Sequence, residues 1–205
     1  YAVYTPLEEI VDPKLEFFSP KPGDPPDYVR IRLANGECVA VTNSCAANVL
    51  GLVTPEHYSY GIVESARRCM EPLAEYLGVS VEEAARQILN KSYEKIKPVI
   101  DEFTVKYRLE KDQTTLVGVG GGAAALLPYT AERMNLSYSI PKYAEVISSI
   151  GVALAMIRDV VERIIPNPTT EDISRIKREA KALAIKNGAV PDTVEVQIEI
   201  DPQTS

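Results

Sequence analysis

A cluster of four glycines within five positions, Gly118 to Gly122, constrains the fold of this chain more than any other feature. Apolar residues 116–117 precede it and three alanines follow it. A continuous apolar run predicts a strand buried on both faces, and the glycines allow a sharp turn and the close approach of another group. The first amides of the following helix have no partner within the helix, and the helix dipole there favours negative charge. The pattern predicts a phosphate- or nucleotide-binding loop, with a tight strand-to-helix connection lacking any ligand as the alternative.

Two familiar phosphate-binding motifs can be tested against this loop. A P-loop requires Lys-Ser or Lys-Thr after the last glycine, and neither is present. The dinucleotide fingerprint is formally met by Gly118, Gly120 and Ala123. It also requires a carboxylate at the end of the next strand, but the strand expected at 136–140 is followed by a proline, and Glu145 lies beyond it. The sequence therefore does not favour a dinucleotide site.

Composition narrows the class of protein. The chain has 205 residues, is 45% hydrophobic and 25% charged, and carries a formal net charge of −7. One domain or one and a half are expected, and nucleic acid is excluded as a partner because phosphate binding needs a concentrated basic face. Cys38, Cys45 and Cys69 show no C-x-x-C spacing, so we expect a reducing, cytoplasmic environment without a zinc site. No apolar run is long enough to span a membrane, so we expect neither a membrane span nor a signal peptide in these residues.

Local signals divide the chain into segments. Residues 1–28 are Pro-rich and predict an irregular strap or linker. Asn35-Gly36 between apolar runs 29–33 and 38–42 predicts a hairpin. Thr54-Pro55-Glu56 has the pattern of a helix cap, and helical spacing runs from Ile62 to Gly78. The remaining expected elements are a short helix at 48–52, a helix opened by a capping box at Ser80, a helix from the glycine loop to about Arg133, a helix at 144–163, a helix from Thr169 to Gly188 and an alternating strand at 194–200.

The polar residues 201–205 read as a turn in the middle of a hairpin, and the chain starts at Tyr1 rather than Met. We therefore expect a piece of a longer protein.

Three segments, residues 78–85, 115–123 and 144–153, resemble the C-terminal half of the hydantoinase/oxoprolinase A family. That family belongs to the superfamily of actin-like ATPases, sugar kinases and Hsp70. The resemblance implies an α/β fold in which two ribonuclease-H-like lobes close over ATP, with the glycine loop on the adenosine side. It implies a lobe with a helical insertion over residues 29–165 and the start of a small α+β appendage over 166–205. It assigns cofactor binding to Gly120, Gly121, Gly122 and Ala123.

Two departures from the family pattern limit what this chain can do. Residues 42–55 match loosely, but Ser44-Cys45-Ala46 stands where the family usually shows Thr-x-Thr-Asp-Ala. The superfamily's phosphate loop, Asp-x-Gly-Gly-Thr, is absent from the 205 residues. Catalytic residues are thus unknown and no metal ligand is assigned. His57 is the single histidine, no Gly-x-Ser-x-Gly motif is present, and the acids have the spacing of solvated helix faces.

The resemblance implies a fragment of an ATP-dependent hydrolase of cyclic amides such as hydantoin or 5-oxoproline. ATP with Mg²⁺ is expected for the full-length protein. The expected partners are the cyclic amide and either the remainder of the chain or a second hydantoinase-type subunit, in an oligomer. The alternative is a non-catalytic, ATP-switched assembly or reactivase-like subunit of the same superfamily. A third possibility is a family relic that binds no nucleotide.

Overall fold

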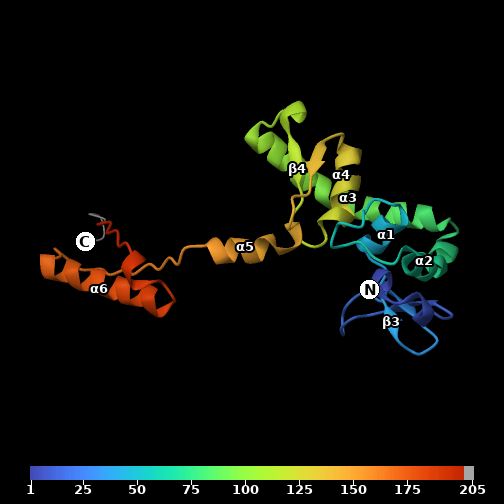
Figure 1. The fold of residues 1–205 in the computed structure, drawn as a ribbon, viewed down its shortest axis with the longest axis horizontal. Coiled ribbons are helices and arrows are strands. Elements are labelled where there is room, and N and C mark those ends of the chain that lie inside the picture. Colours follow the sequence, from blue (N-terminus) through green and yellow to red (C-terminus); the bar gives the residue numbers. More distant parts are fainter. Residues whose placement is uncertain (201–205) are drawn as a thin grey trace. The chain divides into compact units, whose positions relative to one another are not determined.

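The computed structural model describes residues 1–200 and is a mixed α/β structure. The chain forms two compact units, residues 1–148 and 149–205 (Figure 1). The sequence placed the main break at Pro166-Asn167-Pro168, later in the chain than this division. No helix of residues 1–200 has the combined length and apolarity needed to cross a membrane. The predicted turn at 201–205 lies outside the described residues.

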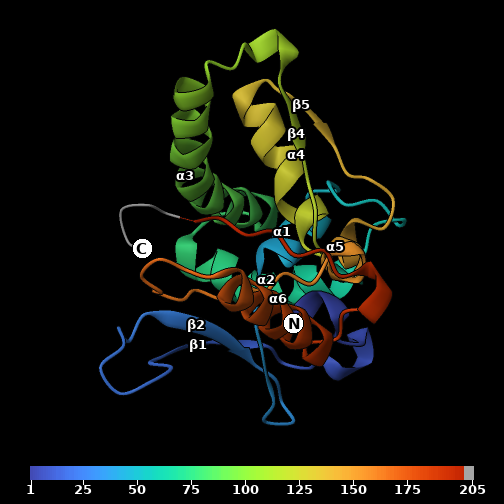
Figure 2. The same cartoon turned by 90° about the vertical axis from the view of Figure 1, so that its left-hand side faces the viewer.

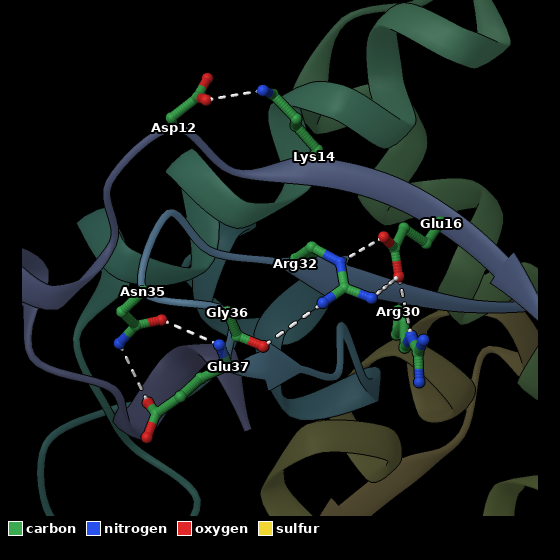
Figure 3. Close-up of polar contacts among 8 residues, drawn as sticks. All are labelled: Asp12, Lys14, Glu16, Arg30, Arg32, Asn35, Gly36 and Glu37. Carbon is green, nitrogen blue, oxygen red and sulfur yellow. Dashed lines mark hydrogen bonds and ion pairs between the residues drawn. The ribbon is translucent and has the colours of Figure 1, made fainter.

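The first unit begins with an antiparallel sheet of three strands, β1 (Lys14–Phe18), β2 (Tyr28–Arg32) and β3 (Cys38–Val39). The predicted Asn-Gly hairpin is confirmed, since β2 pairs with β3 across a turn in which Gly36 has φ +87°. Figure 3 shows one face of the sheet, where Glu16 of β1 lies between the guanidinium groups of Arg30 and Arg32. The amide of Glu37 donates to Asn35 Oδ1 at 2.9 Å and tightens the turn.

The prediction that residues 1–28 are an irregular strap is wrong in part. They contain β1, which pairs with β2 along all five of its residues, and two 3-10 turns at Ala2–Tyr4 and Leu7–Glu9. Val3 and Ile10 are buried in the core of the first unit. Prolines flank β1 without interrupting it, so the backbone donors needed for pairing remain available.

Three helices form the centre of the first unit: α1 (Asn43–Val49), α2 (Val63–Leu77) and α3 (Val81–Tyr107). In Figures 1 and 2, α1 and α2 lie between the two sheets of this unit. Gly78 ends α2 in the left-handed conformation at φ +66°, and the Ser80 hydroxyl caps α3 by accepting from the amide of Glu83, as the sequence predicts. The short helix expected at 48–52 is instead α1, earlier in the chain, and no helix begins at Pro55.

The second sheet of this unit is a parallel βαβ unit that carries the glycine loop. It consists of β4 (Thr115–Val117), α4 (Ala123–Met134) and β5 (Ser137–Ser139), with β4 paired to β5. The elements and their order are those predicted. Burial of β4 on both faces is not observed, because the Val117 side chain is 63% exposed. The two-stranded sheet has α4 against one face, and residues 1–148 provide no second layer over the other.

Two predicted helices follow β5, one across the boundary between the two units and one within the second unit. A 3-10 turn at Ala144–Val146 leads into α5 (Ile147–Leu154), so the helix expected over 144–163 ends early. Helix α6 (Thr170–Lys186) has the predicted capping box between Thr169 and Asp172. The alternating segment 194–200 is not a strand, because none of the described residues pairs with it and an extended segment needs a neighbour to complete its hydrogen bonds.

Candidate functional site

The glycine loop leaves the carboxyl end of β4 and enters the first turn of α4. Gly120, Gly121 and Gly122 form the loop, and Ala123 is the first residue of α4. Two hydrogen bonds hold the loop against the end of β5 and the chain that follows it. The amide of Gly118 donates to Ser139 O at 2.9 Å, and the amide of Gly120 donates to Ala144 O at 2.7 Å. The predicted site residues are therefore adjacent, on a backbone anchored at both ends.

Two of the four glycines are required by the fold itself. A Cβ at Gly118 would lie 2.6 Å from Leu127 Cδ2, so its absence allows β4 and α4 to pack closely. Gly120 has φ +91°, a conformation that residues with a Cβ rarely adopt.

The other two glycines differ from these. A Cβ at Gly121 would lie 2.8 Å from Cδ1 of the Tyr58 ring, whereas a Cβ at Gly122 would meet no atom within 4 Å. Gly122 has φ −92°, which any residue can adopt. Neither packing nor backbone conformation accounts for a glycine at 122.

The backbone donors at the start of α4 are unused. Among the described residues, no acceptor contacts the amides of Gly121, Gly122 and Ala124. The first turn of α4 contains no acidic side chain that could approach them. Free amides combined with the positive end of the helix dipole favour an electronegative group at this place.

Tyr58 is a residue of this site that sequence reasoning did not place there. It belongs to the segment between α1 and α2, far from the loop in sequence, and its ring lies against Gly121 while 73% of the residue remains exposed. The segment is held by Asn48, whose amide nitrogen donates to Ser59 O at 2.8 Å and whose amide oxygen accepts from the amide of Gly61 at 3.1 Å. No local signal marks this contact, because it exists only once α1 packs beside α4.

Side chains suited to acid–base chemistry do not gather at the loop. Carboxyl groups with a shifted pKa have it lowered by neighbouring donors: the pKa of Glu16 by hydrogen bonding to Arg32, that of Glu56 by the Thr54 hydroxyl and that of Glu82 by Arg67. A general acid needs the opposite shift. Within residues 1–200, no group of three or more His, Cys, Asp or Glu side chains is arranged to hold a metal ion.

Comparison with known proteins identifies the family. The sequence model of the hydantoinase/oxoprolinase family matches residues 18–161, well over half of the chain. The matched region extends from the end of β1 past α5 and includes the whole glycine loop. A search of curated proteins gave no match. The three resembling segments all lie inside this match, and the chain belongs to the hydantoinase/oxoprolinase family.

Proposed function

We propose that this chain supplies the adenosine side of the ATP site in an ATP-dependent hydrolase of cyclic amides, such as hydantoin or 5-oxoproline. The family supports the substrate class, since hydantoin and 5-oxoproline are both cyclic amides. The nucleotide is supported by the glycine loop. The proposal includes an actin-like ATPase lobe of ribonuclease-H-like topology, for which the β4–α4–β5 unit supplies a parallel strand pair and its crossover helix.

The observation that carries the proposal is the combination of free amides with open space at Gly122. A flat ribose or base can approach a backbone closely only where no side chain intervenes. Gly122 provides this without any packing requirement of its own, and the unpaired amides of Gly121 and Ala124 lie on either side of it. Ligand contact explains a glycine that the fold leaves unexplained.

The chemistry would depend on groups outside this chain. The carbonyl oxygen of the ring amide would accept the γ-phosphoryl group of ATP with release of ADP, after which water would attack the activated carbonyl carbon, the ring C–N bond would break and phosphate would leave. The Asp-x-Gly-Gly-Thr loop that would hold phosphate and Mg²⁺ is absent from the 205 residues, so no Mg²⁺ ligand is assigned here. We propose that the remainder of the natural chain, or a second hydantoinase-type subunit, supplies it.

An incomplete sheet supports such a partner. Gly118, directly after β4, faces α4, so Val117 at the end of β4 points to the opposite face of the sheet, and Val119 follows in the loop. These two valines are 63% and 54% exposed. Parallel sheets are normally covered on both faces, and a second lobe or subunit would cover this one.

The test is ATP binding by the intact protein with Gly122→Val. Gly122 is a better choice than Gly121, since valine at Gly121 would also displace the Tyr58 ring. The matched control is Gly151→Val, because a Cβ at Gly151 also meets nothing within 4 Å. We expect the Gly122 variant to lose at least about tenfold in ATP affinity by calorimetry, equivalent to about 1.4 kcal/mol, while the control binds normally. Equal affinities for the two variants would refute the assignment and favour a relic that binds no nucleotide.

One observation favours the second candidate, a non-catalytic ATP-switched assembly or reactivase-like subunit. Each of the four carboxyl groups with a shifted pKa has it lowered, and residues 1–200 contain no group of three or more His, Cys, Asp or Glu side chains arranged to hold a metal ion. Cyclic amide turnover by the intact protein supports the hydrolase. ATP-dependent release of a partner without amide turnover supports the switch.

A further inference from the structure

A cavity lies at the end of the βαβ unit opposite to the glycine loop. It has a volume of about 260 Å³ and is bounded by the C-terminal half of α3, the segment that joins α3 to β4 and the last turn of α4. Figure 2 shows these two helices side by side, with the joining segment crossing above them. Because α4 has 12 residues, its two ends are about 18 Å apart at 1.5 Å per residue. The cavity is therefore distinct from the loop.

The cavity is cationic in an acidic protein. Lys97, Lys111 and Arg133 line it together with a single acid, Asp101. Lys97 forms an ion pair with Asp101 one helical turn away, which leaves the other two cations in excess. Neither the Lys111 ammonium nor the Arg133 guanidinium has an ion-pair or hydrogen-bond partner among residues 1–200, although the chain has 29 acidic and 22 basic residues.

The other residues that line the cavity are largely apolar, or their hydroxyl groups already donate hydrogen bonds to backbone oxygens. The Arg133 guanidinium lies 5.5 Å from the centre of the Tyr93 ring, a contact that restricts its position, and Met134 lies beside it on α4. The hydroxyl of Thr104 donates to Ile100 O at 2.8 Å, so it is already used within α3. The hydroxyl of Thr114 likewise donates to Glu110 O. Lys111 and Arg133 are the donors that remain for a ligand.

We propose that this cavity binds a small organic anion, whose carboxylate or phosphate group is held by Lys111 and Arg133 and whose apolar part lies against Tyr93 and Met134. Arginine and lysine together suit such a group, because the guanidinium fork binds two oxygens and the ammonium adds a point charge. The volume of about 260 Å³ suits a small anion of this kind.

The test is an NMR titration of the ¹⁵N-labelled 205-residue chain with three probes, namely phenyl phosphate, benzoate and inorganic phosphate. We expect the two aromatic anions to bind, and amide shifts to gather at residues 97–104, 111–114 and 133–136. Whichever of phenyl phosphate and benzoate binds more tightly shows whether the cavity prefers a phosphate or a carboxylate group. Inorganic phosphate should bind about tenfold more weakly than phenyl phosphate, because it gains nothing from the apolar wall. Equal binding of these two probes, or shifts located elsewhere, would overturn the proposal.

A double variant tests the two cations directly. Lys111→Gln with Arg133→Gln should weaken phenyl phosphate binding about tenfold or more, since charge-assisted hydrogen bonds are lost. The matched control, Lys142→Gln with Lys177→Gln, removes the same charge from exposed positions outside the cavity and should bind as the parent does. Preserved amide spectra would show that both proteins fold. Unchanged affinity in a folded Lys111/Arg133 variant would reject the site.

Discussion

Replacement of Asn48 by alanine tests whether one buried side chain holds the segment that carries Tyr58 to the glycine loop. Asn48 is 2% exposed. Its amide nitrogen donates to Ser44 O and to Ser59 O, each at 2.8 Å, and its oxygen accepts from the amide of Gly61 at 3.1 Å. Through these bonds α1 is joined to the chain that leads into α2.

The expected magnitude follows from the groups that alanine would leave without partners. Among the described residues, Ser59 O and the amide of Gly61 have no other partner. Each orphaned buried group costs about 1–3 kcal/mol, so we expect the free energy of unfolding to fall by about 2–6 kcal/mol. Since a whole domain is stable by only about 5–15 kcal/mol, this loss should be large enough to measure easily.

The assay is urea unfolding followed by circular dichroism, together with hydrogen exchange at the Gly61 amide, whose protection should fall most. Ser65→Ala is the matched control, because Ser65 is fully buried in α2 and its hydroxyl has no partner within the described residues. This control should leave stability unchanged or raise it by about 0.5 kcal/mol, since alanine is the better helix former. A loss below about 1 kcal/mol for Asn48→Ala, or an equal loss for the control, would contradict the reasoning.

Three further predictions concern packing, pH and thiol chemistry. Gly118→Ala should destabilise the protein by about 1–3 kcal/mol because its Cβ would lie 2.6 Å from a leucine methyl of α4, whereas Gly122→Ala should change the urea midpoint little. Hydrogen bonding from the Thr169 hydroxyl lowers the pKa of Asp172, so the cap of α6 is at full strength above the unfolded pKa of about 3.9 and is lost as pH falls through the lower folded value. Asp172→Asn should remove that pH dependence of helix content, and a pH-dependent melt that persists in the variant would locate its cause elsewhere. Burial raises the pKa of Cys69 to about 11, so iodoacetamide at a pH of about 8 should alkylate exposed Cys38 in the native protein and Cys69 only after urea is added.

Capping signals were the most reliable part of the sequence. Gly78 ends α2, Ser80 caps α3 and Thr169 with Asp172 caps α6, as predicted. Each of these interactions joins residues within a few positions of one another, so the local sequence contains all the partners. The glycine loop between β4 and α4 is confirmed for the same reason.

Predictions of strands, whose pairing residues lie elsewhere in the chain, were less accurate. The strand at Lys14–Phe18 was missed because its pairing residues lie in β2, and the alternating segment 194–200 forms no strand because the described residues offer it none. Periodicity gives a preference for strand, but pairing requires a neighbour.

The sequence by itself determined the capped helix ends at Gly78, Ser80 and Thr169, the strand–loop–helix order around the glycines and the family to which the chain belongs. Tertiary structure alone decided which glycines the fold requires, the contact of Tyr58 with Gly121 and the gathering of unpaired cations between α3 and α4. These features join residues far apart in the chain, and their contacts arise only when α1, α3 and α4 pack together.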